Sequence, residues 1–122
     1  MLISSQTELF FLAEHPEIEK AIFKPGLLTV DENLQLDAFL TASLRAREFS
    51  WLQYRRGLID ASQWDTERVV LISVLDAERV RLWWDRSGRF VVGPEFQAYV
   101  DSVNAANPVG ESWSKLQNWS DP

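Results

Sequence analysis

Residues 29–57 read TVDENLQLDAFLTASLRAREFSWLQYRRG and carry the strongest structural signal in the chain. Thr29 and Glu32 have the spacing of a capping box, in which two side chains accept hydrogen bonds from free backbone N–H groups at the start of a helix. Apolar side chains then recur at steps of three and four residues, the period of one helix face. They are Leu36, Phe39, Leu40, Ala46, Phe49 and Leu52. Gly57 follows, so the segment predicts one long helix over residues 30–56.

A helix that breaks and restarts is predicted before this segment. Ser5 and Glu8 are spaced as a capping box ahead of an apolar run. Pro16 interrupts the pattern, because proline suits only the first turn of a helix. The buried residues expected of the second piece are Ile18, Ala21, Ile22 and Phe23. Lys24-Pro25-Gly26 closes it.

Three more helices are predicted after Gly57. Asp60 and Gln63 form another capping box, and the helix that they open runs through Leu75. Residues 76–86 form the next helix, which Ser87-Gly88 ends. Gly93-Pro94-Glu95 starts the last helix, and Asn107-Pro108 ends it.

The sequence therefore predicts an all-α fold, a single bundle-like domain of about five helices over residues 1–106. Residues 107–122 form a polar tail, docked or frayed, that holds Trp113, Leu116 and Trp119. An α+β fold is the alternative, with a small sheet from residues 69–92, which are rich in β-branched and aromatic side chains. Helical ion-pair spacings in that stretch and just before it favour helices; they are Asp65/Arg68, Asp76/Arg79, Glu78/Arg81 and Arg81/Asp85.

Composition excludes several classes of protein. The 122 residues are 46% apolar and 25% charged, as in a folded domain. The absence of cysteine excludes disulfides and thiolate metal sites. A net charge of −6 argues against nucleic-acid partners and anionic membranes. The charge is uneven, because residues 45–92 hold nine arginines and seven acids, whereas residues 1–44 hold two lysines and seven acids.

The location that the sequence predicts is the cytoplasm. The longest mainly apolar run, Val69 to Leu75, has seven residues, whereas a membrane-spanning helix needs about 20. The N-terminal segment, Met1-Leu2-Ile3 followed by Ser4-Ser5-Gln6, contains no positively charged region, so it does not have the pattern of a secretory signal. A membrane role is therefore not expected.

No catalytic residue, cofactor or metal site is predicted. His15 is the only histidine, and Pro16 beside it favours a capping role over metal binding. Nucleotide-binding glycine loops and zinc-protease motifs are absent from the sequence. An enzyme that uses an Asp or Glu as general base is the third-ranked class, because it needs two carboxylates that face one cavity and helical spacing alone does not establish this.

The candidate residues for binding a ligand or partner are arginines and tryptophans of the middle segment. They are Arg47, Arg55, Arg56, Trp51, Trp64, Trp83, Trp84 and Arg86. These four arginines have no local helical partner, and guanidinium groups bind anions and acidic surfaces well. The structural interpretation is equally simple, because cations suit helix C-termini and tryptophans pack in cores. Trp83 and Trp84 point about 100° apart on a helix, so one of them is expected at a groove or contact.

Four short motifs together resemble a bacterial family of small helical proteins of unknown function. They are Glu14-His15-Pro16-Glu17-Ile18, Tyr54-Arg55-Arg56-Gly57-Leu58-Ile59-Asp60 running to Trp64, Trp83-Trp84 and Gly93-Pro94-Glu95-Phe96. The resemblance implies a helical bundle and supplies no catalytic residues. Members of that family often carry an N-terminal transmembrane segment, which this sequence does not show.

The function predicted from these features is a protein-interaction or regulatory module that self-associates. The partner is a second copy, as in a homodimer, or an unidentified protein. Segregated charge and surplus aromatic surface motivate this prediction. The alternative is a small-molecule binder whose pocket is lined by tryptophan and arginine and takes an anionic ligand.

Overall fold

A computed structural model describes residues 16–109, which form five α-helices and one 3₁₀ turn. The elements are α2 (Pro16–Phe23), α3 (Val30–Arg55), α4 (Ala61–Leu75), α5 (Glu78–Arg86), the turn η1 (Gly88–Val91) and α6 (Pro94–Ala106). The prediction of an all-α bundle is confirmed. The helix predicted from Ser5, the residue His15 and most of the tail, residues 110–122, lie outside the described residues.

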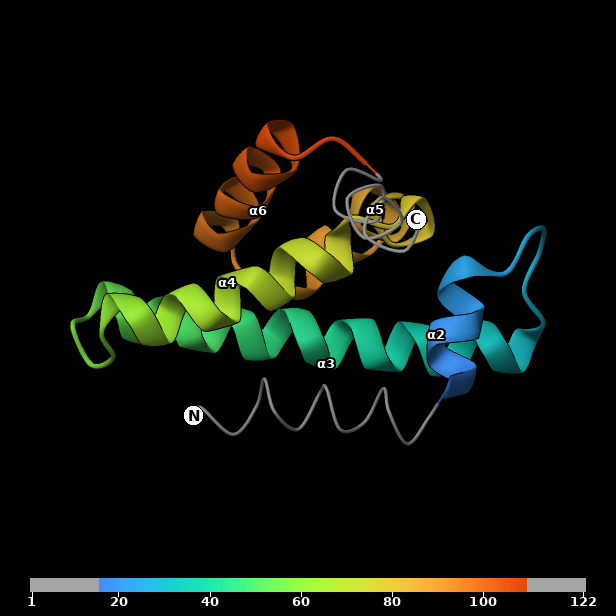
Figure 1. The fold of residues 1–122 in the computed structure, drawn as a ribbon, viewed down its shortest axis with the longest axis horizontal. Coiled ribbons are helices and arrows are strands. Elements are labelled where there is room, and N and C mark those ends of the chain that lie inside the picture. The colour runs from blue at the N-terminus through green and yellow to red at the C-terminus, as the bar shows by residue number, and fades with distance from the viewer. Residues whose placement is uncertain (1–15, 110–122) are drawn as a thin grey trace, which may run out of the picture.

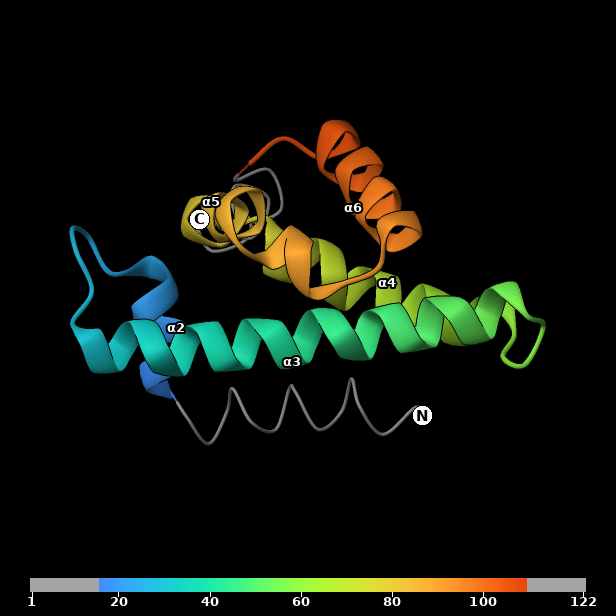
Figure 2. The ribbon, with the colours of Figure 1, turned by 180° about the vertical axis from the view of Figure 1, so that it is seen from behind.

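Helix α3, with 26 residues, is the longest of the described helices. Figures 1 and 2 show α4 lying along it, α2 crossing near its N-terminal end, and α5 and α6 together on one side. The helix packs against α2, α4 and η1. Within residues 16–109, no helix is both long enough and apolar enough to cross a membrane.

The predicted helix boundaries depend on caps that the structure contains. Thr29 Oγ1 accepts from the Glu32 N–H at 3.1 Å, and a carboxylate oxygen of Glu32 accepts from the Thr29 N–H at 2.8 Å. Asp60 and Gln63 make the same reciprocal pair before α4. Gly57 turns the chain between α3 and α4 with φ +76°, a backbone conformation that residues with a Cβ rarely adopt.

Helix α6 has a cap that comes from another helix. Its N-cap residue is Gly93, which has no side chain to accept a hydrogen bond. A carboxylate oxygen of Glu48 on α3 accepts from the Gly93 N–H at 2.6 Å. This contact fixes the start of α6 against the C-terminal half of α3.

Residues 69–92 contain helices and no strand, so the α+β alternative is wrong. They form the second half of α4, the whole of α5 and the turn η1. Leu71 and Leu75 are four residues apart on α4 and are both buried, as helical spacing requires. The Oγ of Ser73 donates to the Val69 carbonyl one turn earlier. Burial of one helix face therefore outweighs the β propensity of the valines.

The buried face of α3 differs in part from the prediction. Leu36, Phe39 and Leu40 are buried as expected. Phe49 is 51% exposed, so its predicted place in the core is wrong. The face continues instead through a polar series whose members are Ser43, Arg47 and Ser50, and Leu44 and Trp51 are buried next to them.

Arg47 lies in this core as half of an ion pair. Its side chain is fully buried, and its Nε lies 2.5 Å from a carboxylate oxygen of Glu67, which is 3% exposed. The Ser50 hydroxyl donates to the other oxygen of Glu67 at 3.3 Å. A charge buried in a core needs such a partner, because desolvation of a lone charge costs several kcal/mol. The pair therefore joins α3 to α4 and accounts for the buried Arg47 and Ser50 of α3.

Helix α5 is attached to its surroundings by arginines that donate to backbone carbonyls. Arg81 donates to the carbonyls of Leu75, Asn104 and Asn107, at the ends of α4 and α6. Burial lowers the pKa of Arg81, and the charges of Asp76 and Asp85 act against this shift. The predicted ion pairs of Arg81 with acids three or four residues away are thus replaced by contacts with distant segments.

Candidate interaction site

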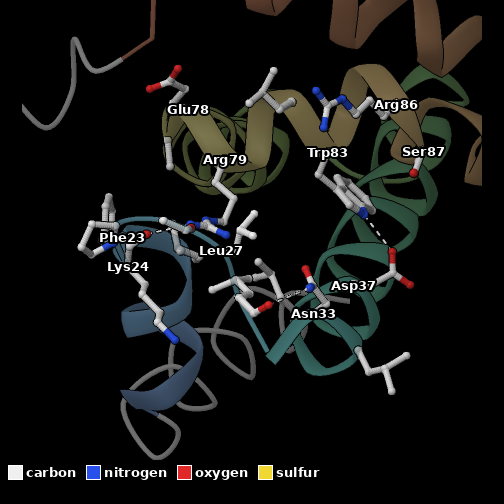
Figure 3. Close-up of a pocket in the computed structure, with 18 residues that line it drawn as sticks. Phe23, Lys24, Leu27, Asn33, Asp37, Glu78, Arg79, Trp83, Arg86 and Ser87 are labelled. Atoms are coloured by element: carbon white, nitrogen blue, oxygen red, sulfur yellow. Dashed lines mark hydrogen bonds between the residues drawn. The ribbon is translucent and has the colours of Figure 1, made fainter. Parts of the chain in front are cut away.

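A hollow of about 980 Å³ lies between α5 and the segment that joins α2 to α3 (Figure 3). We call it the α5 hollow. Its lining residues come from the end of α2, the joining segment, the first part of α3 and the whole of α5. They are Ile22, Phe23, Lys24, Pro25, Gly26, Leu27, Leu28, Asn33, Leu34, Leu36, Asp37, Ala77, Glu78, Arg79, Leu82, Trp83, Arg86 and Ser87.

The segment between α2 and α3 forms the wall of the hollow opposite α5. Gly26 has φ +79°, which permits the reversal of the chain. The Lys24 ammonium donates to Glu32 at 2.8 Å. This hydrogen bond is the largest cause that lowers the pKa of Glu32 to about 2, and the Thr29 N–H adds to the effect. The capping box of α3 and the Lys24 side chain thus connect the two ends of the segment.

Arg79 connects this wall to α5. Its guanidinium donates to the carbonyls of Lys24 and Gly26 at 2.6 and 2.7 Å. Figure 3 shows the Arg79 side chain pointing from α5 across the hollow toward the segment. The sequence predicted Asp76 as the partner of Arg79, and the structure places the guanidinium on backbone oxygens instead.

Trp83 forms a fixed part of the hollow. Its Nε1 donates to a carboxylate oxygen of Asp37 on α3 at 2.8 Å, a contact drawn in Figure 3. The other side of its ring lies against Gly88, where a Cβ would stand 2.7 Å from Cε3. The indole is therefore held between α3 and the start of η1 and cannot turn freely.

Opposite charges stand at the two ends of α5 beside the hollow. Glu78 and Arg86 are both exposed, and neither makes a hydrogen bond or ion pair within residues 16–109. Figure 3 shows them at opposite ends of the helix. Leu82 lies midway between them in sequence and is 44% exposed. The rim of α5 thus exposes an acid, a leucine and a guanidinium.

Large apolar side chains surround the α5 hollow. Leu27 in the joining segment is 94% exposed, and Leu34 on α3 is 64% exposed. Phe23 at the end of α2 is 48% exposed. Exposed apolar side chains that gather around a hollow are typical of a contact surface, whereas scattered ones are ordinary.

A second, mainly apolar hollow of about 590 Å³ lies between α2 and α4. Its lining includes Phe23, Phe39, Val69 and Val74. It contains one charged side chain, Glu19, and none of the arginines or tryptophans predicted as binding residues. The α5 hollow therefore accounts better for those residues.

The predicted site residues fall into separate places. Trp83 and Arg86 both line the α5 hollow. Arg47 is buried with Glu67, so it is a core residue. Trp84 is fully buried and donates to Asp101 at 3.0 Å. Trp84 is thus buried whereas Trp83 lines the hollow, which agrees with the expectation that one of the two adjacent tryptophans lies at a groove.

Trp51 and Trp64 belong to an aromatic cluster that joins α3, α4 and α6. The cluster also contains Tyr54, Phe96 and Tyr99, with ring centroids 5.4–6.1 Å apart. Arg55 lies over the Trp51 ring at 4.7 Å and pairs with Glu95 at 3.1 Å. Burial raises the pKa of Tyr99. Trp51, Trp64 and Arg55 therefore contribute to packing between the helices. Arg56 is exposed just after the end of α3.

Some residues of the hollow were missed by the sequence reasoning. Leu82, with Glu78 four residues before it and Arg86 four residues after it, has the spacing of one helix face, which was a usable signal. Leu27 and Asp37 had no such signal, because their position beside α5 depends on tertiary packing.

Among residues 16–109, no group of three or more His, Asp or Glu side chains is arranged to hold a metal ion.

Comparison of the chain with protein-family models, with curated proteins and with solved structures found no match.

Proposed function

We propose that this chain is a protein-interaction module that associates with itself, and that the α5 hollow and its rim are the contact surface. The observation that carries this proposal is the group of exposed leucines, Leu27, Leu34 and Leu82, around a hollow with a fixed indole. Burying such side chains in a contact is favourable by about 25 cal/mol per Å² of apolar area.

The hollow suits a macromolecular contact because its parts are held in place before any partner binds. Arg79 fixes the joining segment to α5, and Asp37 fixes the ring of Trp83. A surface that is already ordered loses little conformational entropy on binding. The charges of Glu78 and Arg86 at its edge supply orientation and specificity.

We also propose that the chain belongs with the bacterial family of small helical proteins that its motifs resemble. Among these motifs, Gly93-Pro94-Glu95-Phe96 has a structural role, since Gly93 and Pro94 start α6 and Phe96 is buried. The Tyr54 to Trp64 motif spans the turn between α3 and α4 and contributes two rings of the aromatic cluster.

Light scattering coupled to size-exclusion chromatography tests the self-association. The full chain is loaded at concentrations from about 1 to 500 μM, which brackets the range of weak and moderate interfaces. We expect an average mass that rises with concentration toward twice the 14.1 kDa of one chain. A mass of 14.1 kDa at every concentration would contradict the proposal.

The second candidate function is binding of a small anionic ligand in the same hollow. The favouring observation is the exposed guanidinium of Arg86 on the same wall as the fixed indole of Trp83. Native mass spectrometry of the freshly purified chain tests it against a denatured sample. An adduct that disappears on denaturation and in Arg86→Ala, but persists in Arg56→Ala, would support the binder. A spectrum without adducts would contradict it.

A further inference from the structure

We infer that the partner is a second copy of this chain, and that α5 packs antiparallel against α5 of that copy with the two-fold axis at Leu82. The inference rests on the proposed self-association and specifies its geometry. It is drawn from three residues of one helix, Glu78, Leu82 and Arg86.

The spacing of these residues is what a two-fold axis requires. They are four residues apart, so they lie along one face of α5, and the outer two are about 12 Å apart along the axis. In a two-fold contact, residue i meets residue j of the partner, and j meets i. An antiparallel helix pair centred on Leu82 therefore brings Glu78 of each copy opposite Arg86 of the other.

The charges of this face are available for such a pairing. Glu78 and Arg86 have no hydrogen-bond or ion-pair partner in the described part of the chain. The other charged side chains of α5 point elsewhere. Arg79 and Arg81 donate to backbone carbonyls, and Asp85 lies 3.9 Å from Arg89. The antiparallel arrangement thus pairs Glu78 and Arg86 of each copy with Arg86 and Glu78 of the other, which gives two identical ion pairs.

A parallel arrangement of the same helices does not have this property. It would place Glu78 opposite Glu78 and Arg86 opposite Arg86, and like charges in contact are destabilising. The sign pattern of α5 therefore selects the antiparallel pairing. Leu82 at the centre of the pair is 44% exposed in one copy and becomes the apolar core of the contact.

The size of the contact sets its expected strength. A nine-residue helix offers less than the roughly 800 Å² per partner of a standard stable interface. The exposed leucines Leu27 and Leu34 at the rim of the hollow extend the apolar area. We accordingly expect association in the micromolar range or weaker, readily reversible on dilution.

Charge reversal with mixing tests the register. In Glu78→Arg all four charges of the pairing are positive, and in Arg86→Glu all four are negative. We expect each variant alone to self-associate at least about tenfold more weakly than wild type by sedimentation velocity. An equimolar mixture of the two should associate with near wild-type affinity, because every pair is again of opposite sign. The double variant E78R/R86E should likewise pair with itself.

Matched controls separate this effect from loss of charge or fold. Asp31→Arg removes an exposed first-turn acid of α3, as Glu78→Arg does for α5. Arg45→Glu reverses an exposed helical arginine away from the hollow. Both controls should associate as wild type does, and circular dichroism should show equal helicity in all variants.

The outcomes distinguish the inference from the proposed function. If wild type associates and the charge reversals change nothing, the α5 pairing is wrong while self-association stands. If the single variants weaken association and the mixture does not recover it, the antiparallel register is wrong. A wild-type chain that stays monomeric at all concentrations contradicts both.

Discussion

The ring of Trp83 lies against Gly88, at a position where any side chain would collide with it. A Cβ on residue 88 would stand 2.7 Å from Cε3 and from Cη2 of the indole. On its other side, the indole N–H donates to Asp37 at 2.8 Å. The ring is therefore held at two opposite edges, and these contacts fix its place in the wall of the α5 hollow.

Gly88→Ala is expected to destabilise the fold by about 1–3 kcal/mol, because the added methyl group forces the indole or the backbone to shift. Chemical denaturation followed by far-ultraviolet circular dichroism measures the loss. In a Trp83→Leu background the same substitution should cost much less, since the ring is absent. Equal costs in the two backgrounds would show that the contact between Trp83 and Gly88 is not the cause.

Replacing Glu67 by Leu should cost about 3–5 kcal/mol of unfolding free energy, because the Arg47 guanidinium stays buried without its carboxylate. The double variant R47L/E67L removes both charges and should recover most of that loss. Denaturant titrations of the two single variants and the double variant provide the cycle. A double variant that is less stable than both single variants would contradict the account of this ion pair.

Glu32→Gln is expected to lower the thermal midpoint at neutral pH but not in strong acid. The folded-state pKa of Glu32 is about 2, below the ordinary 4.5. The folded chain therefore binds fewer protons than the unfolded chain between these values, and acidification through that window removes the stabilisation. Thermal scans of wild type and variant should converge as the pH falls from about 4.5 to about 2.

The matched variant for this prediction is Lys24→Met, which removes the largest cause of the lowered pKa. Its difference from wild type should shrink over the same pH window. A gap that stays constant down to pH 2 in both variants would mean that the Glu32 carboxylate does not stabilise the joining segment.

Glu48→Ala should cost about 1 kcal/mol, the usual loss for removing a helix cap, because the Gly93 N–H loses its acceptor. Adding Gly93→Ser to that variant gives α6 an N-cap side chain and should restore part of the loss. Urea denaturation measures both steps. If the serine brings no gain in the Glu48→Ala background, the cap is not what Glu48 contributes.

The helix boundaries were predictable because they depend on neighbours in sequence. Thr29 with Glu32 and Asp60 with Gln63 are local pairs, and the structure contains both capping boxes. Pro94 in the first turn of α6 is likewise a local signal. Such features require no knowledge of how the helices pack.

The core face and the site were less predictable because they depend on distant segments. Arg47 is a core residue because Glu67 on the next helix neutralises it, and Phe49, two positions further along α3, is exposed. Arg79 reaches carbonyls more than fifty positions earlier in the chain. Of the eight predicted site residues, Trp83 and Arg86 line the α5 hollow.

Single-cysteine crosslinking tests the proposed α5 pairing most directly, since the chain contains no cysteine of its own. Leu82→Cys places the thiols of two copies together at the two-fold axis, within the Cα separation of about 4.4–6.8 Å that a disulfide needs. Leu58→Cys, in the turn between α3 and α4, is the control, because Leu58 is 67% exposed against 44% for Leu82 and so is the more accessible position. Under mild oxidation, non-reducing electrophoresis should show rapid conversion of Leu82→Cys to a covalent dimer and slow conversion of Leu58→Cys. Equal rates of crosslinking in the two variants would contradict the α5 pairing.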